Sequence, residues 1–137
     1  MKFTQQSPNN NTVISIDEST ITLSHTQLKI PCFISSKKVE EVSISSLEEI
    51  SKEALFPLLS QESLDLLIIG TGKHSKFLSP KQQVSLSELE LGVECMNNVS
   101  ACSSFNLLLS DLRPVGLLIL WLITFSKKLK FSIDSLK

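Results

Sequence analysis

The sequence predicts an α/β domain built on a central sheet and preceded by a small antiparallel β assembly. Three observations on the 137-residue chain support this class. Hydrophobic residues make up 42% of it, which favours a globular core over a disordered chain. The first third shows hairpin-like alternation, and from Leu64 onward short apolar runs alternate with helical periodicity. The resulting order of strand, helix, strand, helix, strand indicates an α/β unit.

The first third of the chain predicts a group of short strands after a polar start. Residues 1–11 are rich in Gln and Asn, and we expect them to be frayed. Extended pieces are expected at 13–16, 21–23, 28–34 and 39–44. Pro31 cannot donate to a ladder, so it favours an edge position or the end of a ladder for the third piece. Together these pieces predict an antiparallel assembly.

The middle of the chain is organised around one strand and its turn. A helix is expected first, starting near Ser51 and carrying Pro57 inside its apolar pattern. The apolar run 64–69 then predicts a buried strand, which ends in a glycine turn. Ser79 followed by Pro80 is typical of a helix N-cap and first position, so a second helix is expected over 80–89.

Two further apolar runs complete the predicted sheet. Residues 91–96 indicate a second buried strand, 99–110 a helix and 115–121 a third strand. A single domain is therefore expected over 12–124, followed by a lysine-rich C-terminal extension over 125–137.

Composition and charge restrict the function classes. Thirteen basic residues face fourteen acidic ones, so nothing in the overall charge favours nucleic acid as a partner. The N-terminus lacks the pattern of a signal or transit peptide, and the most hydrophobic run, 115–125, is too short for a transmembrane segment. Three cysteines without a CxxC pair indicate reduced thiols and a cytoplasmic protein. We expect no metal and no cofactor, because neither HExxH nor paired cysteines occur.

The best candidate site is the glycine turn after the central strand. Backbone N–H groups of such a turn can cradle an anion, and two side chains there can add positive charge. The residues of this turn are Gly70, Thr71, Gly72, Lys73 and His74. The P-loop and dinucleotide fingerprints are incomplete, so a purely structural turn is the alternative.

Two more residues can join this cleft from the third helix. Cys102 lies near the helix start, where the dipole can lower a thiol pKa, but no orienting partner completes a catalytic group, so no catalytic residue is assigned. Asn106 either points into the cleft or satisfies a buried backbone group.

The last apolar run offers a possible interface. Leu118, Leu120 and Trp121 belong to a run that is too apolar for a half-exposed strand. It is either core or partly exposed, and in the second case it predicts a protein partner or a homodimer.

Four segments carry a family resemblance. They are Leu-Ile-Ile-Gly-Thr-Gly at 67–72, Leu-Gly-Val-Glu-Cys-Met at 91–96, Ala-Cys-Ser-Ser-Phe-Asn at 101–106 and Val-Gly-Leu-Leu-Ile at 115–119. In order and spacing they resemble the Mth938-like (DUF498) family, which is of largely unknown function and whose relatives include a mitochondrial complex I assembly factor. The resemblance implies a three-layer α/β fold with a mixed central sheet of about five strands and a small N-terminal β-hairpin assembly.

The chain departs from this family at three places. Relatives often carry glycine where this chain has Glu90 and Leu112, at positions where a turn favours a positive φ angle. The often basic position after Ala-Cys is Ser103 here. If relatives bind a ligand through that basic side chain, this protein has lost or relocated the contact.

Two functions remain open from the sequence. The first is a non-enzymatic binding or assembly-assisting module that acts through protein contacts. The alternative is a protein, or a weak enzyme, that binds an anion or small molecule at the cleft around Gly70–His74.

Overall fold

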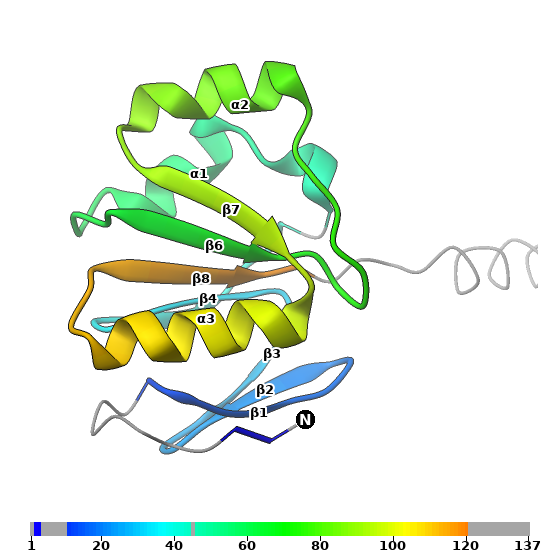
Figure 1. Cartoon of the computed structure of the whole chain (residues 1–137), viewed down its shortest axis with the longest axis vertical. Coiled ribbons are helices and arrows are strands. Elements are labelled where there is room, and N and C mark those ends of the chain that lie inside the picture. The colour runs from blue at the N-terminus through cyan, green and yellow to red at the C-terminus, as the bar shows by residue number, and fades with distance from the viewer. Residues whose placement is uncertain (1, 4–10, 45, 121–137) are drawn as a thin grey trace, which may run out of the picture.

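The computed structural model describes residues 2–3, 11–44 and 46–120 (Figure 1). Two sheets organise this part of the chain. The three-stranded sheet is antiparallel, in the order β1-β2-β3, and the five-stranded sheet is mixed, in the order β5-β4-β8-β6-β7. The predicted α/β fold, with its mixed sheet and its N-terminal β assembly, is therefore confirmed.

The hairpin pattern of the first third forms the three-stranded sheet. Its members are β1 (Val13–Ile16), β2 (Thr20–Leu23) and β3 (Gln27–Lys29). The Asp17 carboxylate closes the first turn by accepting the backbone N–H groups of Ser19 and Thr20, both at 2.8 Å. Within the stretch expected to be frayed, Lys2 bridges to Ser15 beside β1, and Asn11 is buried. The predicted domain limits extend beyond the described residues and stay predictions.

The expectation of one extended piece over 28–34 is wrong. The chain changes sheets at Pro31: β3 ends before it, and β4 (Cys32–Ser35) belongs to the large sheet, where β5 (Val39–Glu41) and β8 flank it. All four residues of β4 are buried, as in an internal strand. Pro31 therefore marks a boundary between two ladders, and the carbonyl oxygen of Pro31 accepts the N–H of Val42 at 3.0 Å.

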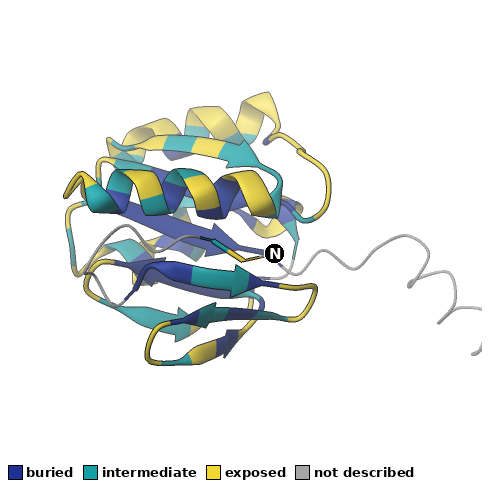
Figure 2. Ribbon diagram, turned by 60° about the horizontal axis from the view of Figure 1, so that its bottom comes forward, coloured by how far each residue is buried: buried dark blue, intermediate teal, exposed yellow. Residues whose placement is uncertain are grey.

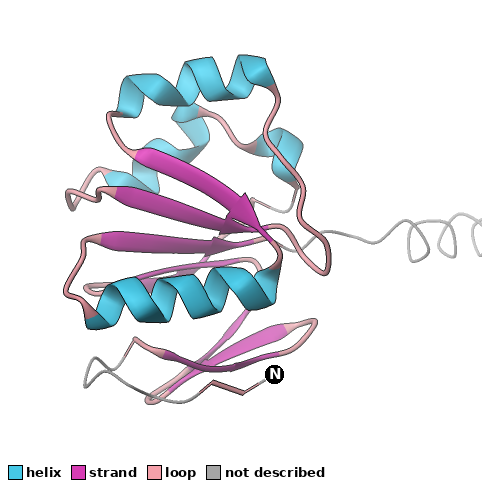
Figure 3. Cartoon of the chain, viewed as in Figure 1, coloured by secondary structure: helices cyan, strands magenta, loops and turns pink. Residues whose placement is uncertain are grey.

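The remaining elements follow the predicted α/β order (Figure 3). They are η1 (Leu47–Glu49), α1 (Lys52–Leu59), β6 (Leu66–Gly70), α2 (Pro80–Leu86), η2 (Ser87–Leu89), β7 (Gly92–Met96), α3 (Asn98–Ser110) and β8 (Val115–Ile119). The expected helix starts hold, because Ser51 caps α1 and Ser79 caps α2 through their side-chain oxygens. β6 lies between β7 and β8 and is parallel to both.

One strand differs from expectation in its burial. β7 was expected to be buried, yet it forms an edge of the large sheet, and Gly92 and Glu94 are exposed on it (Figure 2). Its apolar side chains are only half-buried, which a continuous apolar run does not predict.

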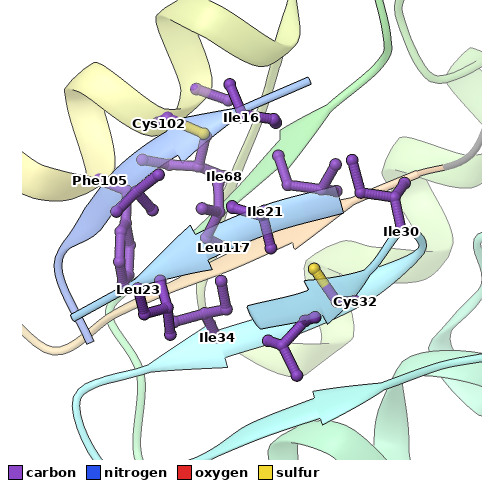
Figure 4. Packing of buried hydrophobic residues seen from close by; sticks show 14 of the residues in the cluster. Ile16, Ile21, Leu23, Ile30, Cys32, Ile34, Ile68, Cys102, Phe105 and Leu117 are labelled. Atoms are coloured by element: carbon purple, nitrogen blue, oxygen red, sulfur yellow. The ribbon is translucent and has the colours of Figure 1, made fainter. Parts of the chain in front are cut away.

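The large sheet packs on both faces. One face meets α3 and the three-stranded sheet, and Phe105 and Cys102 lie in this core (Figure 4). The other face meets η1, α1 and α2, and Phe33, Leu55 and Leu67 are fully buried there. Two layers therefore sandwich the sheet, as the three-layer prediction requires.

Two side chains occupy left-handed backbone, where the family resemblance places glycine. Leu112 has a φ of 60° and Glu90 a φ of 57°. The N–H of Leu112 donates to the Leu109 carbonyl at 3.0 Å, and the N–H of Arg113 donates to the Leu108 carbonyl at 3.0 Å. These two bonds form a Schellman motif that ends α3, and its left-handed position normally carries glycine.

Replacing Leu112 by glycine is expected to raise the free energy of unfolding by about 1 kcal/mol, because glycine removes the left-handed strain. Leu112 is 90% exposed, so little packing is lost. Urea denaturation measures the change. The matched control is Leu107→Gly, an exposed site inside α3, where glycine costs about 1 kcal/mol. Equal losses at both sites contradict the argument.

Candidate functional site

The glycine turn is built by close packing at the carboxyl end of β6. A Cβ atom on Gly70 would come within 2.5 Å of the Asn98 side-chain oxygen and within 2.5 Å of the Ile119 Cδ1. Glycine at this position therefore lets the start of α3 and the end of β8 approach the strand. Gly72 has a φ of 96°, which an L side chain rarely adopts.

The turn is held from inside by hydrogen bonds. The N–H of Thr71 donates to the Met96 carbonyl at 2.9 Å, and the N–H of Gly72 donates to the Asn98 side-chain oxygen at 2.9 Å. The buried Thr71 hydroxyl donates to the His74 carbonyl at 2.7 Å. These contacts account for the turn structurally, because both N–H groups already have partners. Its binding role stays a prediction.

The structure separates the residues that the sequence grouped into one cleft. Lys73 and His74 are exposed on the loop after β6. Cys102 is fully buried under the three-stranded sheet. Asn106 binds the backbone of Val13 in β1 through both of its side-chain polar atoms, which is the structural alternative stated for it.

The two described interface candidates of the last strand are buried. Leu118 is fully buried and Leu120 is 1% exposed, so both belong to the core. Trp121 lies outside the described residues. In the part of the chain that the structure describes, no three His, Cys, Asp or Glu side chains group as metal ligands, and no helix is long and apolar enough to cross a membrane.

The three thiols differ in environment. Burial raises the pKa of Cys32 and of Cys102 from 9.0 to about 12, and each of these side chains is fully buried. Burial also raises the pKa of Cys95, which the N–H of Leu78 lowers in part, but Cys95 is only half-buried at the sheet edge. None of these shifts favours a thiolate, so all three environments oppose nucleophilic chemistry.

In the native protein, a maleimide is expected to label Cys95 much faster than Cys32 or Cys102, and peptide mass spectrometry reads the order.

Folding retains protons on the two buried thiols that the unfolded chain loses above pH 9. The free energy of unfolding should therefore fall between about pH 9 and 12. Rapid labelling of Cys102 in the folded state contradicts this environment.

A groove of about 270 Å³ lies between α2 and the free edge of β7. Val93 and Cys95 line it from β7, Leu91 lines it from just before that strand, and Leu86 lines it from α2. Phe77 stands at the groove with 76% of its surface exposed. Gln83 and Ser87 also line it, so the groove combines apolar and polar groups with an exposed aromatic side chain, as protein contact sites do.

The sequence reasoning did not find this groove. Its two walls are separate segments, and the residues of α2 do not indicate that this helix leaves a strand partly open. The available signal was the alternation of Leu91, Val93 and Cys95, which is typical of a half-buried strand.

Sequence comparison identifies the family. A family described as "Protein of unknown function (DUF498/DUF598)" matches residues 13–120. The chain belongs to this family. DUF498/DUF598 membership agrees with the Mth938-like resemblance of the four sequence segments, and the match covers both sheets.

Two curated relatives match part of the chain. Over 85 residues the chain is 29% identical to NADH dehydrogenase [ubiquinone] 1 alpha subcomplex assembly factor 3 of Xenopus tropicalis, covering 61% of this chain and 46% of that protein. The chain thus spans about half the length of the curated relatives that it matches.

Solved structures show the same architecture. A Bordetella parapertussis protein aligns with a TM-score of 0.71 at 22% identity, over 80% of this chain and 94% of that one. A Mth938-like domain of Bordetella pertussis aligns with a TM-score of 0.66 at 20% identity, over 88% and 92%. These likenesses support the DUF498/DUF598 fold.

Proposed function

We propose that this DUF498/DUF598 chain is a non-enzymatic protein-binding module that assists the assembly of a protein complex. The observation that carries the proposal is the groove between α2 and β7, with Phe77 exposed beside it. The name of the Xenopus tropicalis relative, an assembly factor, supports the same role.

The chemistry of the groove fits a protein contact. A few residues supply most of the binding energy in protein interfaces, and aromatic side chains are enriched at the centre of such interfaces. Phe77 can supply such an anchor, and the groove beside it offers a recess for a partner side chain. The area around Phe77 is also positively charged, since Lys73, Lys76 and Lys81 are exposed on the same loop and helix.

The proposal is tested by affinity capture with Phe77→Glu in the full chain. We expect the proteins captured by the parent chain to be lost, because a carboxylate opposes burial of this surface. The matched control is Phe56→Glu, since Phe56 is 63% exposed on α1 and does not line the groove. Capture that survives Phe77→Glu, or that both variants abolish equally, overturns the proposed surface.

The compartment in which the module acts belongs to the same proposal. The composition predicts the cytoplasm, and fluorescence imaging of the tagged full chain tests that prediction.

A further inference from the structure

We infer that the free edge of β7 and the adjacent groove together bind an extended segment of a partner protein as an added strand. The segment places an apolar side chain in the groove and a lysine or arginine beside Glu94. This inference rests on the proposed function and specifies how the partner is held.

The outward-facing backbone groups of β7 can pair with a further strand. The N–H of Gly92 donates to the Asp65 carbonyl at 2.9 Å, and the Met96 carbonyl accepts the N–H of Thr71 at 2.9 Å, so both residues turn toward β6. Backbone groups alternate in direction along a strand, so Val93 and Cys95 turn theirs outward. Within the described residues, β7 pairs with β6 alone, and Figure 1 shows α2 on the side of β7 away from β6.

The opposite edge of the sheet is less suitable. β5 is three residues long, and its Glu41 carboxylate already accepts the backbone N–H of Lys29 from the small sheet. Short and covered edges resist strand addition. β7 has five residues, and on its outer side a neighbouring loop binds the backbone only beyond the strand, where the N–H of Asn97 donates to the Ser75 hydroxyl at 3.2 Å.

The groove lies where an added strand needs a pocket. Val93 and Cys95 point to the face that α2 covers, and both line the groove. Side chains of an added strand alternate between the two faces, so every second one reaches the groove. A volume of about 270 Å³ accommodates one large apolar side chain. Backbone pairing with a pocket for alternate side chains is the β-augmentation mode of peptide recognition.

Glu94 determines the charge of the one occupant residue that lies beside it. It lies between Val93 and Cys95, is exposed on the opposite face, and forms no ion pair with another described residue. An antiparallel pair of two β7 strands centred on this residue would place one Glu94 opposite the other, which is destabilising. The edge therefore disfavours a second copy in this register and favours a partner with a basic residue there.

The test uses the isotope-labelled full chain and a synthetic peptide, acetyl-Thr-Val-Thr-Phe-Lys-Phe-Thr-Val-Thr-amide. Its apolar residues share one face, and its lysine lies on the other. We expect saturating peptide to slow hydrogen exchange of the Val93 and Cys95 amides at least about ten-fold, because both become bonded. Maleimide labelling of Cys95 should slow as well.

Charge exchange provides the matched controls. Glu94→Lys should weaken peptide binding about five-fold, and a peptide with glutamate in place of lysine should recover that loss. Glu18→Lys, at an exposed turn of the three-stranded sheet, should change nothing.

Three results overturn the inference. One is unchanged exchange of Val93 and Cys95 up to millimolar peptide. The second is protection of both amides in the peptide-free monomer, which would mean that residues 121–137 occupy the edge. The third is protection that rises with dimer formation, which would mean that a second copy occupies it. If Phe77→Glu abolishes capture although the peptide fails, the binding function stands and only the added strand is wrong. If capture also survives Phe77→Glu, both fail.

Discussion

Replacing Phe105 by alanine is expected to lower the free energy of unfolding by about 3–5 kcal/mol. Phe105 is fully buried on α3, at the place where the helix meets both the large sheet and the N-terminal strands. Figure 4 shows its ring beside Leu23 of β2, among side chains that come from both sheets. Truncation leaves a cavity that three elements would have to close together, so relaxation can recover little of the loss. Urea denaturation of the full chain measures the change.

Leu107→Ala is the control on the same helix. Leu107 is 58% exposed, so its truncation should change stability by less than about 0.5 kcal/mol. If the two variants lose the same stability, the loss does not depend on the burial of the side chain, and the assigned packing of α3 is wrong.

Local signals allowed much of the fold to be predicted from the sequence. Ser51 and Ser79 start helices as expected, since capping depends on neighbours within three residues. The apolar run before Gly70 forms a strand as expected. The expected left-handed positions at Glu90 and Leu112 are confirmed, although neither residue is glycine. At these two positions the family resemblance predicted a left-handed backbone that the residue types Glu and Leu do not indicate.

Sheet membership could not be predicted in the same way. β3 and β4 are both short and follow each other closely, and only their tertiary partners assign them to different sheets. The edge position of β7 depends likewise on strand order, since its apolar run also suits a covered strand. Strand order results from contacts between distant segments, which a single sequence does not contain.

The candidate site shows the same limit. The sequence placed Cys102 at the turn because it lies near a helix start, and Asn106 because ligands of open α/β sheets bind beyond the carboxyl ends of the strands. The structure turns both toward the three-stranded sheet instead. The groove was missed because its residues became neighbours only when α2 packed beside an edge strand. Features that depend on one segment were predicted correctly, whereas surfaces formed by two segments were not.

Asn106→Ala is expected to lower the free energy of unfolding by about 2–4 kcal/mol and to loosen the three-stranded sheet. The Asn106 side-chain oxygen accepts the N–H of Val13 at 2.9 Å, and its side-chain N–H donates to the Val13 carbonyl at 3.0 Å. Val13 is fully buried, so alanine leaves two buried backbone groups without partners. Each such group costs about 1–3 kcal/mol. Through these two hydrogen bonds, Asn106 holds β1 against α3.

Thiol labelling separates this local role from general destabilisation. Cys32 and Cys102 lie beneath the three-stranded sheet, whereas Cys95 lies on the other face of the large sheet. If Asn106 ties β1 to α3, Asn106→Ala should speed maleimide labelling of the first two thiols well below the unfolding transition and leave Cys95 unchanged. Ser103→Ala, an exposed change on the same helix, should affect none of them. If labelling of all three thiols rises in parallel, the variant unfolds globally. In that case the two sheets unfold as one cooperative unit, and the local role of Asn106 is wrong.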